Sequence, residues 1–298
     1  MRVFVTGASG YMGSAIVPQL ISAGHHVIGL ARSDASAKSL EAVAAEVHRG
    51  DLEDLKSLKA GAAKADGVIH LAFIHDFSKY VEAAETDRLA IEAIGNELVD
   101  SGKPFVFTSG TMMLPQGSLG TEETLPDVVH PMTSLRGKNE AVGLAFASRG
   151  VRVSVIRLPP TVHGETDHGF VARTINIAVE KGVSAYIEGQ HRWSAVHRLD
   201  AAGVYKLALE KAEASSVFHA VAEEGVPTQD IANAIGKQLS LPVVAKPVEE
   251  AQAHFGFVAL LFGADNPVSS KQTQEQLGWH PTQAGLIEDL EQGHYFKK

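Results

Sequence analysis

Short apolar runs alternate with longer amphipathic stretches along the first half of the chain. Six of these runs are rich in valine, isoleucine and phenylalanine, the composition of buried strands. They lie at residues 3–5, 26–30, 46–48, 67–71, 105–107 and 151–156. Helical patterns lie between them, at residues 11–23, 35–45, 53–63, 80–101 and 134–148. This alternation predicts an α/β fold, a doubly wound parallel (Rossmann) sheet with helices on both faces.

The alternation loosens after about residue 158. Helical stretches there are separated by short extended pieces, and they lie at residues 170–181, 199–212, 229–239 and 249–261. We therefore expect a Rossmann domain over residues 1–158. Residues 159–298 are expected to form mainly a smaller C-terminal α/β lobe that binds substrate, with some segments returning to the sheet. Such a lobe would close over the carboxyl ends of the strands, where ligands bind in these sheets.

Three glycines follow the first predicted strand and begin the first predicted helix, in the sequence Thr6-Gly7-Ala8-Ser9-Gly10-Tyr11-Met12-Gly13. In a dinucleotide-binding turn the first glycine permits the tight bend and the second lets backbone amides approach phosphate oxygens. The third lets the helix pack closely on the sheet, and the helix N-terminus adds partial positive charge. The segment is therefore predicted to hold the pyrophosphate of a dinucleotide.

Composition narrows the classes of partner. The 298 residues carry a net charge of -9 and no cysteine. The charge argues against nucleic acid or an anionic membrane as the main partner, and the missing thiols exclude disulfides and fit a cytoplasmic location. The N-terminus lacks a signal-peptide pattern, and no 18-residue apolar span is found. No cluster with metal-ligand spacing is found either, so we expect no metal.

The glycine spacing, Gly-x-x-Gly-x-x-Gly, resembles that of the extended or atypical branch of the short-chain dehydrogenase/reductase superfamily, the NAD-dependent epimerase/dehydratase type. The resemblance extends over nearly the whole chain. Its further motifs are Gly50-Asp51-Leu52, Ile69-His70-Leu71-Ala72, Phe107-Thr108-Ser109, Arg157-Leu158-Pro159 with Gly164, Val196-His197 with Asp200, and Leu277-Gly278-Trp279-His280-Pro281. Their order implies this fold and a nicotinamide cofactor.

The end of the second strand bears on the choice of cofactor. NAD-binding proteins place an acid there, whereas this chain has Ala31, followed by Arg32 and Ser33. An arginine suits a 2′-phosphate, so we expect NADP(H) in preference to NAD(H), although Asp34 lies nearby. The residues expected to bind the cofactor are Gly7, Ser9, Gly10, Tyr11, Met12, Gly13, Arg32, Ser33, Asp51, Leu52, Leu71, Ala72, Phe73, Thr108, Ser109, Lys138, Leu158, Pro159 and Val162.

The catalytic segment departs from the family pattern. The family carries Tyr-x-x-x-Lys on the helix after the fifth strand, and we align Ser134 and Lys138 with these two residues. The alignment implies that Lys138 binds the nicotinamide ribose. Ser134 is too short and too weakly acidic to replace the phenol directly, so as a catalytic hydroxyl it would need a bridging water or a substrate lying deeper in the pocket. The family's helper hydroxyl aligns with Gly110. Thr111 beside it is therefore expected to hydrogen-bond the substrate oxygen.

Another group would then have to supply a proton. His163 and His197 lie in segments that reach the substrate in this family, and histidine suits general acid work, although a structural role is the commoner one. His75 and Tyr186 are further candidates, and the sequence does not select among them. Apolar loop residues, with Arg173 and Arg192 as candidate anion-binding groups, indicate a small and partly apolar substrate. They are Phe73, Met112, Met113, Leu114, Phe170 and Trp193.

Three functions fit these observations. The first is an NADP-dependent oxidoreductase that transfers hydride between nicotinamide and a carbonyl or alcohol of a small molecule. The second is an NADP(H)-binding sensor or scaffold without turnover, since superfamily members that lost the tyrosine include such proteins. The third is a sugar epimerase or dehydratase, against which the missing tyrosine counts. A homodimer is compatible with the family resemblance.

Overall fold

The centre of the molecule is a seven-stranded parallel sheet in the order β10-β6-β5-β4-β1-β2-β3. The computed structural model describes residues 1–129 and 131–297, without the side chains of residues 131–133. The strands are β1 (Arg2–Thr6), β2 (His26–Ala31), β3 (Glu46–Arg49), β4 (Gly67–His70), β5 (Pro104–Gly110), β6 (Arg152–Leu158) and β10 (Ser216–His219). The six predicted strands are confirmed, and β10 adds a seventh beside β6.

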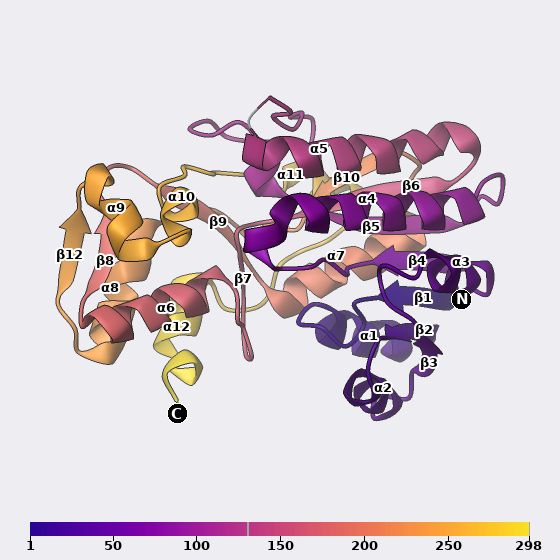
Figure 1. Ribbon diagram of the computed structural model, residues 1–298, viewed down its shortest axis with the longest axis horizontal. Helices are drawn as coiled ribbons and strands as arrows, with labels where there is room; N and C mark the ends of the chain where they lie inside the picture. The colour runs from indigo at the N-terminus through magenta and orange to yellow at the C-terminus, as the bar shows by residue number, and fades with distance from the viewer. Residues whose placement is uncertain (130, 298) are drawn as a thin grey trace.

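Helices cover both faces of this sheet (Figure 1). One face carries α1 (Gly13–Ser22), α2 (Asp34–Glu41) and α7 (Arg198–Lys211); the other carries α3 (Leu55–Ala63), α4 (Tyr80–Glu97) and α5 (Pro131–Leu144). Each face has its own apolar core. Leu20 and Tyr205 are buried in the first, and Ile94 and Phe105 in the second. Because both faces are covered, the inner strands are apolar throughout rather than alternating.

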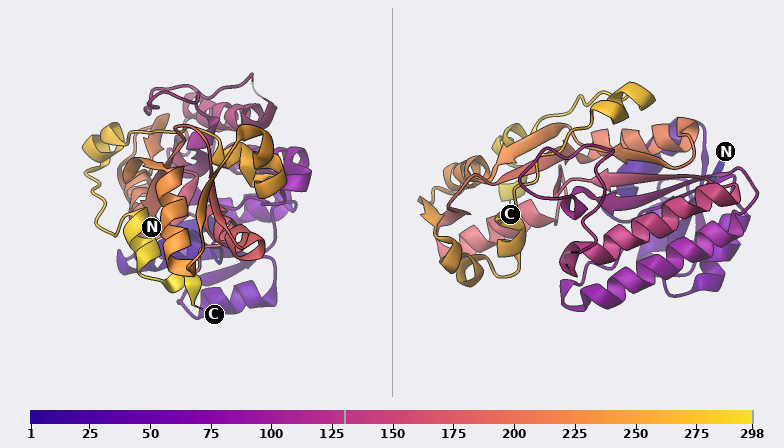
Figure 2. Two further views of the ribbon diagram at one scale, coloured as in Figure 1. Left: turned by 90° about the vertical axis from the view of Figure 1, so that its left-hand side faces the viewer. Right: turned by 90° about the horizontal axis from the view of Figure 1, so that it is seen from above.

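A smaller lobe stands at one end of the sheet (Figures 1 and 2). It contains a three-stranded sheet and a two-stranded sheet with helices packed around them. Its elements are β7 (Thr161–His163), α6 (Phe170–Lys181), β8 (Ser184–Ile187), β9 (Arg192–His197), β11 (Glu223–Pro227), α8 (Thr228–Leu239), β12 (Val243–Lys246), α9 (Val248–Phe255), α10 (Val258–Phe262) and α12 (Leu286–Glu291). Trp193, Phe255 and Phe262 are buried at its centre.

Three elements that follow residue 158 join the main sheet or pack on it. Helix α7 packs against α1, and β10 pairs with β6, so the chain returns from the lobe before entering it again. Helix α11 (Lys271–Leu277) also packs beside α7 and β10. Over the described parts of the chain, none of the helices combines the length and apolar character that a membrane span requires.

The strand order reverses between β1 and β4. From β1 the chain builds outward to β2 and β3, and from β4 it builds the other way to β5 and β6. Ligands bind such sheets outside the carboxyl ends of the strands at this switch point. Here that edge faces the smaller lobe, so the fold forms a crevice between the two.

Candidate active site

The glycine turn follows β1 and has the tight geometry that its sequence predicts. Gly7 has a φ of 66°, and a Cβ there would lie 2.9 Å from the backbone nitrogen of Ala72. A Cβ on Gly13 would lie 2.3 Å from the Gly7 carbonyl oxygen, so the start of α1 also requires glycine. Gly10 has only that carbonyl near its Cβ position, at 3.2 Å, and it lines an open cavity. The turn is therefore tightly packed at Gly7 and Gly13 and open to the cavity at Gly10, the arrangement that a phosphate-binding turn requires.

The cavity extends from this turn across the strand ends to the smaller lobe and has a volume of about 1510 Å³. Most of the residues expected to bind a cofactor line it. They are Gly7, Ser9, Gly10, Tyr11, Met12, Gly13, Arg32, Asp51, Leu52, Leu71, Ala72, Phe73, Thr108, Ser109, Leu158, Pro159 and Val162. The volume exceeds that of a typical small-molecule pocket, so it has room for a dinucleotide together with a substrate.

One end of the cavity is lined by residues that follow β2 and β3. Arg32 lines it, and within the described chain no carboxylate pairs with its guanidinium. Asp34 forms an ion pair with Arg49 instead, at 2.7 Å. Ser33 does not line the cavity, contrary to our expectation. It caps α2, where its hydroxyl accepts a hydrogen bond from the Ser36 amide at 3.2 Å, and Ser36 lines the cavity in its place.

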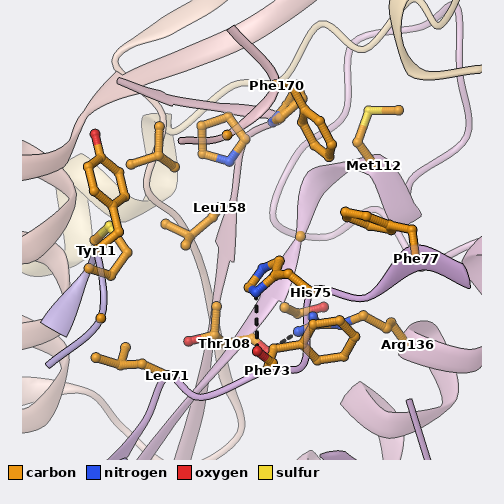
Figure 3. A pocket seen from close by; sticks show the side chains of 18 of the residues that line it. Tyr11, Leu71, Phe73, His75, Phe77, Thr108, Met112, Arg136, Leu158 and Phe170 are labelled. Carbon is orange, nitrogen blue, oxygen red and sulfur yellow. Dashed lines mark hydrogen bonds between the residues drawn. The ribbon is translucent and has the colours of Figure 1, made fainter. Parts of the chain in front are cut away.

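Arg136, on α5, lines the wall of the cavity beside Phe73 (Figure 3). Its guanidinium donates a hydrogen bond to the main-chain oxygen of Thr108 at 2.7 Å, and it lies 4.2 Å from the centre of the Phe73 ring. These two contacts hold a positive charge above the end of β5. We did not predict Arg136 from the sequence.

A buried carboxylate lies near Arg136. Asp87, on α4, accepts hydrogen bonds from Asn139 at 2.9 Å and from His70 at 3.3 Å. Burial alone would raise the pKa of Asp87, but Arg136, His70 and Asn139 together keep that pKa below its usual value. The Arg136 cation in the cavity wall therefore has a fixed, ionised counter-charge behind it.

Lys138 corrects our alignment of the catalytic segment. It is exposed on the outer side of α5 and does not line the cavity. Two residues along a helix turn the side chain by about 200°, so Lys138 and Arg136 point in opposite directions. We therefore align Arg136, instead of Lys138, with the lysine of the family's Tyr-x-x-x-Lys motif. With this shift the tyrosine of the motif aligns with Met132 in the sequence. Arg136, Glu140 and Gly143 recur at helical spacing. This pattern in the sequence could have shown that Arg136, and not Lys138, lies on the inward face of α5.

Neither hydroxyl expected to help catalysis lines the cavity. Thr111, in the short 3₁₀ helix η2 (Thr111–Met113), is buried and donates a hydrogen bond to Asn266 at 2.7 Å. Its side chain therefore joins η2 to the C-terminal lobe, which corrects the role that we gave it. Ser134 is buried and also lies outside the cavity lining. Ser109 does line the cavity, and among the described residues its buried hydroxyl has no hydrogen-bond partner.

Three residues expected near the substrate have structural positions instead. His163 is fully buried, and its Nδ1 lies within hydrogen-bond distance of the Asp289 carboxylate, at 2.8 Å. His197 caps α7 by accepting a hydrogen bond from the Leu199 amide. Trp193 is fully buried in the core of the lobe, and its indole donates to a main-chain oxygen there. None of the three lines the cavity.

His75 and Met112 do line the substrate end of the cavity. The His75 ring projects into it, and Nδ1 lies 3.1 Å from the main-chain oxygen of Phe73 (Figure 3). The cavity walls partly desolvate His75, although the residue remains accessible to solvent, and this desolvation lowers its pKa. The positive charge of Arg136 lowers that pKa further. The surrounding walls are aromatic and include two residues that the sequence analysis did not single out, Phe77 and Tyr80.

The two arginines considered for anion binding differ. Arg192 forms a two-pronged ion pair with Asp265, both contacts at 2.8 Å. Arg173 lines the cavity and lies over the rings of Phe77 and Phe257, 5.9 and 5.1 Å from their centres. Over the described residues no carboxylate forms an ion pair with it. Only Arg173 is therefore available to an anionic group.

A glycine turn after the first strand, and a large cavity at the switch point of a doubly wound sheet, define a dinucleotide-binding protein of the Rossmann class. Comparison with known families is more specific. Residues 3–221 match the model of the NAD dependent epimerase/dehydratase family, and the chain belongs to that family. The predicted superfamily is thereby confirmed. Its members are epimerases, dehydratases and reductases that act with a nicotinamide dinucleotide.

Individual relatives extend this result. An uncharacterized protein of Schizosaccharomyces pombe is 52% identical over 298 residues, 99% of this chain and 100% of that protein. The 4-hydroxy-2-methyl-3-oxo-4-farnesyl-3,4-dihydroquinoline-1-oxide ketoreductase of Stigmatella aurantiaca is 25% identical over 240 residues, 77% of this chain and 70% of that enzyme. The dTDP-glucose 4,6-dehydratase of Streptomyces venezuelae, solved with NAD bound, superposes with a TM-score of 0.79. Its 18% identity, over 99% of this chain and 98% of that one, shows a common fold.

Proposed function

We propose that this protein is an NADP(H)-dependent oxidoreductase that interconverts a carbonyl and an alcohol in a small, largely apolar molecule. The observation that carries the proposal is the substrate end of the cavity, where apolar and aromatic side chains surround the fixed cation Arg136. A desolvated positive charge in such a setting stabilises an oxygen on which negative charge develops. The ketoreductase relative supports this reaction class.

The preference for NADP(H) rests on Arg32. Ala31 ends β2 where an acid would bind a ribose 2′-hydroxyl, and Asp34 is held by Arg49. Arg32 has no carboxylate partner among the described residues, and Ser36 lines the same cavity. Such a guanidinium suits the doubly charged 2′-phosphate better than a neutral ribose. The residues at this end of the cavity therefore fit the phosphorylated cofactor.

The protein's contribution to the reaction is to position groups and to stabilise charge. When bound, the nicotinamide supplies or accepts the hydride. Gly7, Gly10 and the N-terminus of α1 would hold the pyrophosphate, while Leu71 and Leu158 would lie along the nicotinamide half. Arg136 would bind the oxygen of the reacting carbon or a ribose hydroxyl beside it. Its contact with Thr108 keeps the guanidinium in place without substrate, so little reorganisation would be needed.

A sugar-nucleotide reaction fits the cavity less well. Each sugar hydroxyl needs a polar partner in the site, because a buried hydroxyl without a hydrogen bond costs binding free energy. Phe77, Met112 and Phe170 line the region where a sugar would lie. Their surfaces favour an apolar substrate body.

The test is consumption of NADPH by the whole protein with a panel of carbonyl compounds. We would use benzaldehyde, acetophenone and a long-chain alkanal. UDP-glucose, the sugar-nucleotide comparison, would be incubated separately with NAD⁺ or NADP⁺ and followed by analysis of its products, because epimerisation and dehydration consume no NADPH. We expect turnover with at least one apolar carbonyl compound and none with UDP-glucose. Tight NADPH binding with no turnover of any compound would favour the sensor instead, and conversion of UDP-glucose would favour the epimerase.

A further inference from the structure

We propose that His75 is the acid–base residue of this site and exchanges the proton that the family's tyrosine would otherwise provide. The inference rests on the oxidoreductase function proposed above and adds a catalytic residue to it. With Arg136 at the lysine's place, the tyrosine's place falls on Met132, a residue type with no proton to exchange. The proton must therefore come from another group that faces the substrate.

The hydrogen bonding of His75 determines which ring nitrogen is available. Nδ1 lies 3.1 Å from the Phe73 main-chain oxygen, and a carbonyl oxygen can only accept. Nδ1 therefore carries the hydrogen and donates it. In the neutral ring Nε2 is then left with a free lone pair, and the ring projects into the cavity (Figure 3). A substrate hydroxyl could donate directly to Nε2.

The charges around His75 favour its neutral form. Arg136 on α5, Arg173 on α6 and His168 in the preceding loop all oppose a positive charge on the ring, whereas the Phe73 carbonyl favours it. Partial desolvation by the cavity walls is the largest effect, and the net result is a pKa of His75 below the ordinary histidine value. At neutral pH the ring is therefore a base ready to accept a proton, and it becomes an acid only after accepting one.

The proton and electron balance is simple. In oxidation the alcohol would give its O–H proton to Nε2 of His75 and its carbon-bound hydrogen, as hydride, to a bound oxidised nicotinamide, which would leave a C=O bond. In reduction the carbonyl carbon would accept hydride from a bound reduced nicotinamide, and the oxygen would take the proton of Nε2–H. Solvent then exchanges a proton with the ring through the open cavity. Arg136 would hold the oxygen in both directions.

Other groups in the cavity are less suited to this role. Tyr80 lines the cavity, but burial raises the pKa of its phenol, so it ionises less readily than an ordinary tyrosine. The hydroxyl of Ser109 is far less acidic than the phenol of Tyr80 or a protonated histidine ring. Arg136 remains protonated at any working pH and cannot exchange a proton.

The decisive variant is His75→Gln, which removes the titratable ring but keeps a polar side chain. We expect turnover of the best carbonyl compound of the panel to fall by about 10² to 10⁴-fold, the range for loss of a general acid or base. The dissociation constant for NADPH, measured by fluorescence titration, should change less than twofold. The limb of the pH–rate profile that reports the histidine should disappear. His280→Gln, at an exposed position outside the cavity, is the matched control.

Two further readouts separate the possible failures. Nitrogen NMR of the protein with NADP⁺ should show hydrogen on Nδ1 of His75, and added imidazole should restore part of the turnover of His75→Ala. Full turnover by His75→Gln, or hydrogen on Nε2, would overturn the proposal for His75 alone. Wild-type protein that binds NADPH but turns over no carbonyl compound would overturn the proposed function itself.

Discussion

Asp34 is held 2.7 Å from Arg49, and this ion pair keeps the acid away from Arg32. The two partners lie at the ends of neighbouring segments, Asp34 at the start of α2 and Arg49 at the end of β3. The pair is largely exposed and adds little to stability. Its effect is electrostatic: it neutralises the one acid that follows Arg32 closely, so the positive charge at the cavity edge is not cancelled.

Arg32→Gln is therefore expected to weaken NADPH binding and to leave NADH binding unchanged. Loss of a charge-assisted hydrogen bond costs about 1.5–3 kcal/mol, which corresponds to roughly 10- to 150-fold in affinity. Fluorescence titration with both nucleotides measures the ratio of the NADPH and NADH dissociation constants directly. Arg88→Gln, at a partly exposed position on α4 outside the cavity lining, is the matched control and should bind both nucleotides like the wild type. Equal losses for NADPH and NADH would argue that Arg32 does not contact the 2′-phosphate.

Arg136 and Lys138 provide a second test within one helix. Arg136→Gln should reduce carbonyl turnover by about 10²-fold, the order found when one donor to a developing oxyanion is removed. Lys138→Gln should leave turnover unchanged, because that side chain points away from the cavity. Steady-state kinetics of both variants, with circular dichroism to check folding, make the comparison. The opposite order of effects would restore the alignment that places Lys138 at the nicotinamide.

Much of the fold could be predicted because its signals are local. Apolar runs, amphipathic helical stretches and the Gly7–Gly10–Gly13 turn each depend on neighbouring residues, so periodicity and spacing were sufficient. The edge strand β10 was not predicted, because its four residues follow a helix deep in the second half and resemble the lobe strands around them. Its place depends on pairing with β6, which the sequence does not display.

The site was harder to predict because side-chain direction is not local. A motif shifted by two residues on a helix reverses which side chain faces the cavity, and this error led to Lys138 in place of Arg136. The histidines show a second limit. His163 and His75 both follow strands in the sequence, but only the fold shows that Asp289 pairs with the first and that the second faces open space.

A third prediction concerns stability against pH. His219 is fully buried, donates from Nδ1 to the Ser269 main-chain oxygen at 2.8 Å and accepts a bond from Arg157 at 3.2 Å. Burial, together with the charge of Arg157, lowers the pKa of His219 from 6.5 to about 3. Because the folded pKa is the lower one, the unfolded chain binds the proton first as pH falls. The contribution of neutral His219 to the free energy of unfolding is thus complete above pH 6.5 and is lost as the pH falls from 6.5 to 3.

His219→Gln should remove this dependence. Between pH 7.5 and 5.5 the wild type should lose about 1.4 kcal/mol more of its unfolding free energy than the variant does, since one pKa unit corresponds to that amount. Urea unfolding at the two pH values measures both differences. The variant is expected to be less stable at pH 7.5, because buried partners lose a hydrogen bond. An identical pH response in the two proteins would mean that His219 titrates normally.

The last prediction concerns substrate charge. Arg173 lies over Phe77 and Phe257 at the substrate end of the cavity, and among the described side chains no carboxylate neutralises it. A cation held on aromatic rings is partly desolvated, so it attracts an anion more strongly than a free arginine does. Arg192 cannot act in this way because Asp265 already occupies its guanidinium. We therefore expect carbonyl compounds with a carboxylate to bind better than their uncharged analogues.

Arg173→Gln tests this expectation with an internal control. For a carboxy-substituted benzaldehyde, KM should rise by about 10-fold or more, since a charge-assisted hydrogen bond contributes about 1.5–3 kcal/mol. For benzaldehyde itself KM should change little, and kcat should be similar for both compounds because Arg173 does not contact the reacting carbon. A parallel rise in KM for both aldehydes would indicate instead that Arg173 only supports the aromatic wall formed by Phe77 and Phe257.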